Sequence, residues 1–154
     1  MTGVQTCALP IWIGTLRSVV FWITSAVASA VVFAAIHWGE VQLVIGASGV
    51  ISAFMGAACR FAFPPRGRRL SRRPVHTYPT LSVAEVLASR PAVSFLLVWL
   101  AGNMLVAFGM PILGTASAAV AWEAHIGGLL FGFFAFPLFD RKPDFAPETR
   151  VNDL

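Results

Sequence analysis

The stretch Gly46-Ala47-Ser48-Gly49, followed by VISAFMGAACRF, places a serine on a glycine-flanked turn at the start of an apolar helix. Far downstream, Ala124-His125-Ile126-Gly127-Gly128 places a histidine near the start of another apolar segment. A serine hydroxyl becomes a useful nucleophile only when an adjacent base takes its proton, and histidine is the usual base. Ser48 and His125 are therefore a candidate nucleophile and base. Whether their side chains lie close together depends on how the rest of the chain folds.

The composition is that of a membrane protein. Hydrophobic residues make up 57% of the 154 positions and charged residues 12%, about half the charged share that is usual for a soluble domain. Seven of the eleven basic residues fall between Arg60 and Arg90, a cluster that sets membrane topology and does not indicate nucleic-acid binding. Two cysteines, Cys7 and Cys59, are too few for a disulfide framework or a metal site, and we expect neither metal nor cofactor.

The two ends of the chain are expected to lie outside the folded domain. Residues 1–11 (MTGVQTCALPI) carry no charge and no clear period, and they resemble the translation of a sequencing adaptor. We expect a non-native or disordered leader there and exclude it from the fold. The membrane domain then covers residues 12–142, and the polar segment 143–154 is expected to be a disordered tail.

The first membrane helix is predicted over about residues 17–38. Between Arg17 and Glu40 lie 22 residues without a formal charge, enough to cross a bilayer at about 1.5 Å rise per residue. A stripe of small residues recurs every four positions along this segment, at Ala26, Ala30 and Ala34. Such a stripe favours close approach of another helix.

The second helix, predicted over about residues 47–63, is too short to cross alone. Some sixteen apolar residues rise roughly 24 Å, against a hydrocarbon core of roughly 30 Å. With its basic end at the cytoplasmic face, its start at Ser48 lies below the outer surface. Non-helical backbone at that depth persists only when protein buries it or when it lines a water-filled cavity. The sequence therefore predicts a wet pocket at Ser48.

The remaining segments complete a four-helix topology. Segment 64–90 holds five arginines within positions 66–73 and is cytoplasmic by the positive-inside rule, and its stretch SVAEVLASR predicts a short interfacial helix. The 32 uncharged residues from Pro91 to Trp122 exceed one crossing, and a break at Met110-Pro111 divides them. We predict helices over about 91–110 and 118–139.

Alternating helix directions bring the serine and the histidine to a similar depth. Ser48 opens the second helix, and His125 lies about two turns into the fourth, roughly 10 Å from its outer end. Each helix also carries a face of small residues with a four-residue repeat, which lets two backbones approach closely. These faces are Gly49, Ala53 and Ala57 on the second helix, and Ala124, Gly128 and Gly132 on the fourth.

The quoted motifs resemble a known family. GASG followed by VISAFMG, with AHIGGLLFG downstream, is similar to the motifs around the catalytic residues of the rhomboid intramembrane serine proteases, and the resemblance covers roughly Leu16 to Arg141. It implies an all-α, polytopic membrane bundle in which four of the usual six transmembrane helices are present, and we expect the native gene to encode the other two. It also implies transmembrane protein substrates in the lipid bilayer, cut near the outer face, and a multi-pass location in the bacterial inner membrane.

The chemistry implied is a Ser-His dyad. His125 takes the proton of Ser48 as the hydroxyl attacks a peptide carbonyl, and Glu123 lies on another side of the helix, so no acidic residue orients the histidine. The Ser48 backbone N–H is expected to donate to the oxyanion, and Gly46 and Gly49 are expected to let substrate approach closely. The HxxxN pattern that helps form the family's oxyanion hole is absent, and we do not expect Asn103 to replace it. Ser52 stands where some members place a tyrosine that stacks on the catalytic histidine.

Other interpretations remain open at the level of sequence. Ser48 is also a reasonable N-cap, and His125 is also a reasonable buried histidine bonded to a carbonyl. Phe95 and Trp99, one turn apart on the third helix, are candidates for the lateral gate through which rhomboid substrates are thought to enter. The alternative function is a rhomboid-like pseudoprotease that binds transmembrane segments without cleaving them. A transporter fragment would show paired broken helices, and no internal repeat is present.

Overall fold

The computed structural model describes residues 13–42, 45–63, 80–112 and 121–140. Helices account for most of these residues: α2 (Thr15–Ile36), α3 (Ser48–Phe61), α4 (Val83–Ala88), α5 (Arg90–Ile112) and α6 (Trp122–Phe139). The expected leader, most of the loop before residue 80 and the tail lie outside the described residues.

Three helices of the described part, α2, α5 and α6, are long and apolar enough to cross a membrane. The 14 residues of α3 rise only about 21 Å, so α3 is shorter than the hydrocarbon core. The prediction of an all-α membrane bundle is confirmed, with α2, α3, α5 and α6 as the four expected membrane helices.

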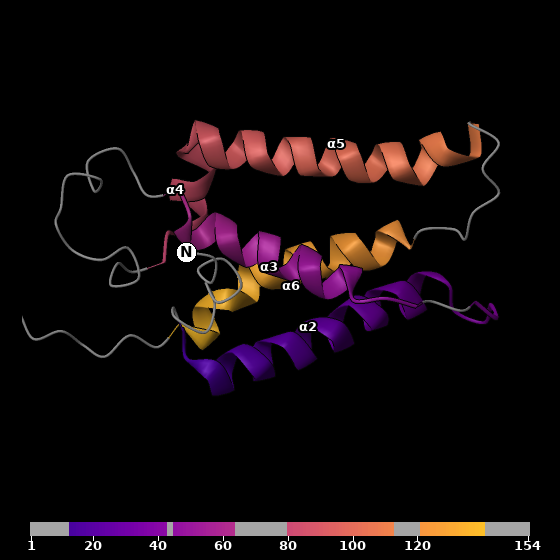
Figure 1. Cartoon of the computed structure of the whole chain (residues 1–154), viewed down its shortest axis with the longest axis horizontal. Coiled ribbons are helices and arrows are strands. Elements are labelled where there is room, and N and C mark those ends of the chain that lie inside the picture. Colours follow the sequence, from indigo (N-terminus) through magenta and orange to yellow (C-terminus); the bar gives the residue numbers. More distant parts are fainter. Residues whose placement is uncertain (1–12, 43–44, 64–79, 113–120, 141–154) are drawn as a thin grey trace, which may run out of the picture.

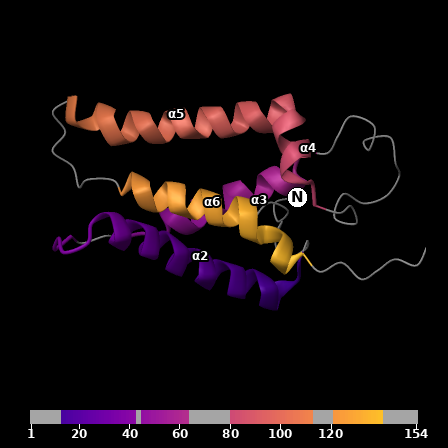
Figure 2. The same cartoon turned by 180° about the vertical axis from the view of Figure 1, so that it is seen from behind.

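The bundle is built around one central pair of helices. α3 and α6 make the most extensive contact, α2 packs on α6 and to a lesser extent on α3, and α5 has only limited contact with α6 and with the short α4. α2 and α5 lie on opposite sides of the pair (Figures 1 and 2). Successive long helices run in opposite directions, so the start of α3 and the start of α6 lie at the same end of the molecule (Figure 1).

The start of α6 differs from the prediction in a way that matters for the site. The third helix was expected to end at about Met110, and α5 continues two residues further, through Pro111 to Ile112. A proline in the last turn removes one backbone hydrogen bond but leaves the preceding turns intact. α6 begins at Trp122, so His125 lies in its first turn and not two turns in. Residues 113–120, which include the expected start at 118, are outside the described part.

Close backbone contact holds α3 against α6. A Cβ added to Gly128 would collide with the carbonyl oxygen of Gly49, and one added to Gly132 would collide with the carbonyl oxygen of Ala53. Gly56 of α3 lies equally close to the backbone of α6 at Leu129. Because backbone atoms cannot move aside as a side chain can, the spacing of the two helices depends on these three glycines.

The buried face of α2 consists of three serines and Phe21, not of the predicted alanine stripe. Ser18, Ser25 and Ser29 are buried, whereas Ala30 and Ala34 are exposed. Each of the three serine hydroxyls donates to the backbone carbonyl four residues earlier, at 2.6–2.9 Å. Serine is small enough for close packing, and this internal hydrogen bond removes the cost of burying its hydroxyl.

Aromatic side chains fill the inner half of the bundle. The ring of Phe21 is fully buried and contacts phenylalanine rings of α3 and α6 at centroid distances of 5.1–5.9 Å.

The predicted interfacial helix is present as α4. It begins with a capping box in which Ser82 and Glu85 each accept a hydrogen bond from the other's backbone N–H. The backbone N–H of Leu81 donates to the carbonyl of Arg60, which ties α4 to the end of α3. These contacts anchor the end opposite Ser48.

Candidate functional site

Ser48 is the first residue of α3 and is exposed. The preceding turn depends on Gly46, whose φ of 129° is a conformation that residues with a Cβ rarely adopt. The chain therefore enters α3 through a glycine-dependent bend. This bend leaves the serine hydroxyl free to turn toward α6.

His125 reaches that hydroxyl directly. Its Nε2 lies 2.8 Å from Ser48 Oγ, a hydrogen-bonding distance between residues 77 positions apart in sequence. The imidazole is half-buried in the first turn of α6. The close α3–α6 spacing at Gly49, directly after Ser48, and at Gly128, one turn after His125, makes the distance possible.

The other ring nitrogen of His125 has a partner that the sequence analysis did not assign. Nδ1 lies 2.7 Å from Oδ1 of Asn103, which comes from α5 and is 8% exposed. The sequence signal was an amide in the middle of an otherwise apolar membrane helix, and such polar residues generally face the bundle interior and have a role there. Sequence reasoning weighed Asn103 only for the oxyanion hole and did not consider it as a partner for the histidine.

Gly49 packs closely against two helices, as its place in the small-residue face of the second helix predicted. A Cβ there would lie 2.7 Å from the side chain of Ser29 and 3.4 Å from the carbonyl oxygen of Ala124. Gly49 thus makes room for α2 and α6, and its expected role in the approach of a substrate stays a prediction. The N–H groups of Ser48 and Gly49 precede the first α3 bond, which Ile51 donates to Ala47. Both are therefore free of intrahelical partners and available as donors.

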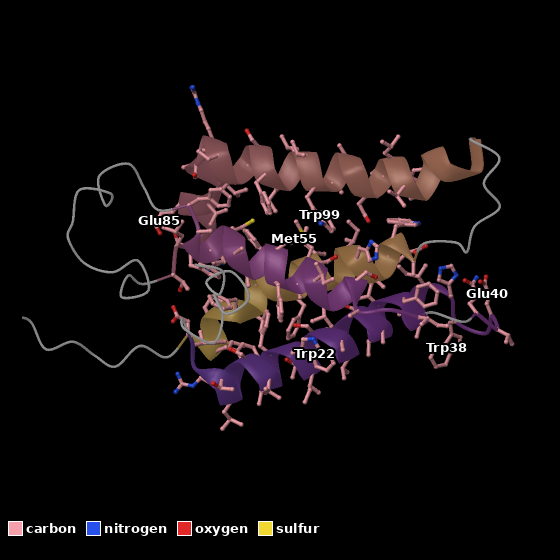
Figure 3. The ribbon with its side chains drawn as sticks, viewed as in Figure 1. Trp22, Trp38, Glu40, Met55, Glu85 and Trp99 are labelled. Carbon is pink, nitrogen blue, oxygen red and sulfur yellow. The ribbon has the colours of Figure 1, made fainter. Side chains whose placement is uncertain are left out.

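The two aromatic gate candidates lie in different surroundings. Phe95 packs in the cluster at the inner end of α3, with its ring 5.6 Å from that of Phe63. Trp99 points from α5 toward α3 (Figure 3). Both side chains are half-buried, and a gate function for the pair stays a prediction. Ser52 stands where some family members have a tyrosine. Its hydroxyl donates a hydrogen bond to the backbone carbonyl of Ser48 at 2.9 Å.

A second polar cluster lies at the C-terminal end of α2. His37 Nε2 lies 3.2 Å from Oε1 of the buried Glu123, and His37 Nδ1 lies 2.9 Å from Oε2 of Glu40. Gln42 also donates to Glu40, at 2.7 Å. Glu40 and Trp38 lie beyond the end of α2 (Figure 3). Glu123 therefore faces α2 and not His125, and it fastens the first turn of α6 to the end of α2.

This cluster borders an open cavity of about 470 Å³, lined by residues 33–34, 37–40 and 42. Neither Ser48 nor His125 lines it. Hydrogen bonding to Glu40, helped by Glu123, raises the pKa of His37 above 6.5. The hydrogen bond from His37 likewise lowers the pKa of Glu40 below 4.5. These hydrogen bonds thus favour the protonated imidazole of His37 and the ionised carboxylate of Glu40.

These shifts predict how the link between α2 and α6 depends on pH. The contribution of His37 to stability is complete below pH 6.5 and is lost as the pH rises through its raised pKa. The contribution of Glu40 is complete above pH 4.5 and is lost as the pH falls through its lowered pKa. Thermal unfolding in detergent should show the difference between parent and His37→Gln shrinking as the pH rises above 6.5. A constant difference from about pH 5.5 to about pH 9 would contradict this assignment.

Metal chemistry has no candidate in the part of the chain that the structure describes. No group of three or more His, Cys, Asp or Glu side chains is placed there to hold an ion. The chemistry at Ser48 and His125 is that of a hydroxyl, an imidazole and an amide.

A comparison with protein-family models gives a match over most of the chain. The model of the rhomboid domain matches residues 7–141, which is most of the sequence and includes every residue of the site. No curated protein and no solved structure matches significantly.

Proposed function

Because the chain belongs to the rhomboid family, we propose that it is an intramembrane serine endopeptidase with Ser48 as nucleophile and His125 as general base. The observation that carries this proposal is the 2.8 Å distance from His125 Nε2 to Ser48 Oγ. The N-cap of α3 is Ala47, and Ser48 is already the first helical residue, so the Ser48 side chain does not stand at the capping position. The hydroxyl is instead bonded to the imidazole.

The reaction follows from this geometry. As Ser48 Oγ attacks a peptide carbonyl carbon, its proton passes to His125 Nε2, and the carbonyl oxygen becomes an oxyanion. The free N–H groups at the start of α3 are near the nucleophile and stabilise this charge together with the positive end of the helix. His125 then protonates the leaving amine. A water molecule, deprotonated by the same imidazole, hydrolyses the acyl-enzyme.

The position of the site favours a particular class of substrate. Rhomboid proteins act on membrane proteins in the bilayer, and Ser48 is exposed at one end of the short α3. The carbonyls of a transmembrane helix are bonded within that helix and are closed to attack. We therefore propose substrates whose transmembrane segments contain helix-destabilising residues near the outer face, in the bacterial inner membrane.

A fluorophosphonate probe tests the proposal, because it reacts covalently only with an activated serine. The protein, expressed from its complete gene in detergent or lipid, should be labelled, and the Ser48→Ala and His125→Ala variants should not be. Absence of labelling in the folded parent would refute the proposal and favour a pseudoprotease that binds transmembrane segments.

A further inference from the structure

We propose that Asn103 is a positioning residue, which holds the imidazole of His125 in the tautomer that carries its proton on Nδ1. Its effect on cleavage rests on the proposed function, whereas its effect on the tautomer does not. The juxtaposition that carries the proposal is a single line of three side chains from three helices: Ser48 on α3, His125 on α6 and Asn103 on α5.

The direction of the two hydrogen bonds decides whether His125 can act as a base. An amide oxygen only accepts, so Oδ1 at 2.7 Å requires a proton on Nδ1 of a neutral ring. Nε2 is then unprotonated and accepts the proton of Ser48 Oγ at 2.8 Å. The reverse amide orientation would put Nδ2 beside Nδ1, place the proton on Nε2 and leave no base for Ser48. In the serine protease triad, the wrong tautomer lowers kcat by about 10⁴-fold.

The burial of Asn103 supports a role beyond packing. Its Nδ2 is buried and has no hydrogen-bond partner among the described residues. A buried amide donor left unpaired costs roughly 1–3 kcal/mol, so an apolar side chain of similar size would pack here at lower cost. The free-energy cost of the unpaired amide donor therefore has to be offset by a function. The amide oxygen contacts His125, the candidate base.

An amide also suits a base inside a membrane better than a carboxylate does. A charged side chain at this depth is costly, and the nearest acidic residue along α6, Glu123, is occupied by His37 at the outer end. Asparagine supplies the same acceptor without a charge. It leaves the resting imidazole neutral, as a general base must be.

Nitrogen-15 NMR of labelled histidine tests the assignment without any substrate. The chain has three histidines, so a His125→Ala spectrum identifies the His125 signals. Above the pH at which the imidazole titrates, the parent should show Nδ1 protonated and Nε2 unprotonated. Asn103→Leu, of nearly equal size, should lose this preference, and Asn103→Asp, which keeps an acceptor, should retain it. The proposal fails if Nε2 carries the proton in the parent or if Asn103→Leu leaves the tautomer unchanged.

Cleavage kinetics provide the second readout. We expect Asn103→Leu to lower kcat roughly 10–100-fold with little change in KM, and Asn103→Asp to restore only part of the loss, because the carboxylate supplies the acceptor but adds a charge. Thr24→Val is the matched control, because the Thr24 hydroxyl bonds only to backbone carbonyls of its own helix. A parent that cleaves nothing and labels with no probe would refute the proposed function, while the NMR result would still decide the role of Asn103.

Discussion

Replacing Ser48 with alanine should abolish cleavage of a transmembrane substrate, lowering kcat by about 10⁴-fold or more. His125→Ala should have an effect of the same size, because without the base the hydroxyl stays a poor nucleophile. The two residues share one hydrogen bond, at 2.8 Å, and act as a unit. The double variant should therefore be no slower than the worse single variant. Kinetics in reconstituted bilayers, with substrate held constant per lipid, measure all three.

A hydroxyl of α2 provides a control for these substitutions. Thr24→Val changes a membrane-embedded hydroxyl of α2 that contacts only its own helix, and it should cleave at the parent rate. Effects of the two alanine substitutions that multiply in the double variant would show that Ser48 and His125 act independently. That result would contradict a nucleophile and base working through one bond.

Gly128→Ala should destabilise the bundle by about 3 kcal/mol or more and remove probe labelling of Ser48. The added Cβ collides with the carbonyl oxygen of Gly49, and it also falls 2.8 Å from Ser29 Oγ. A backbone carbonyl inside α3 cannot move without moving the helix, so α3 and α6 must separate. Because this contact lies one turn from the site, separation also breaks the bond between His125 and Ser48.

Gly102→Ala provides the matched comparison. Gly102 is exposed on α5, and a Cβ there meets no atom within 4 Å. Alanine is the better helix former by about 1 kcal/mol, so this variant should be as stable as the parent or slightly more stable. Unfolding in detergent mixtures measures both variants. Equal stability of Gly128→Ala and Gly102→Ala would show that the α3–α6 contact does not depend on Gly128.

The sequence predicted structural features best where one physical constraint acts on many consecutive residues. Hydropathy predicted the membrane helices, because each must span a known thickness. The short apolar segment after Ser48 predicted that the serine starts a helix too short to cross. Helix direction alone predicted that Ser48 and His125 lie at one end of the molecule. The structure has the starts of α3 and α6 at the same end (Figure 1), and the two side chains are 2.8 Å apart.

The sequence could not predict the rotation of each helix about its own axis. α5 is apolar on all sides, so no polar stripe indicates which face meets the bundle, and Asn103 could not be assigned to His125. The same limit explains α2, where the alanine stripe suggested one face and the buried serines form another. Local effects also set the ends of the helices. Pro111 lies within α5, since a proline in a final turn removes only one bond.

The limited contact between α5 and the rest of the bundle has a mechanical consequence. α5 is joined to its neighbours through α4, a few contacts with α6 and the packing of Phe95 near the end of α3, yet it carries the amide that touches the candidate base. A tilt of α5 away from α3 would widen the space beside Trp99 and, by the same motion, stretch the bond between Asn103 and His125. If α5 tilts in this way and the proposed function holds, the motion that admits a substrate also misaligns the imidazole, and cleavage then requires α5 to return to the position described above.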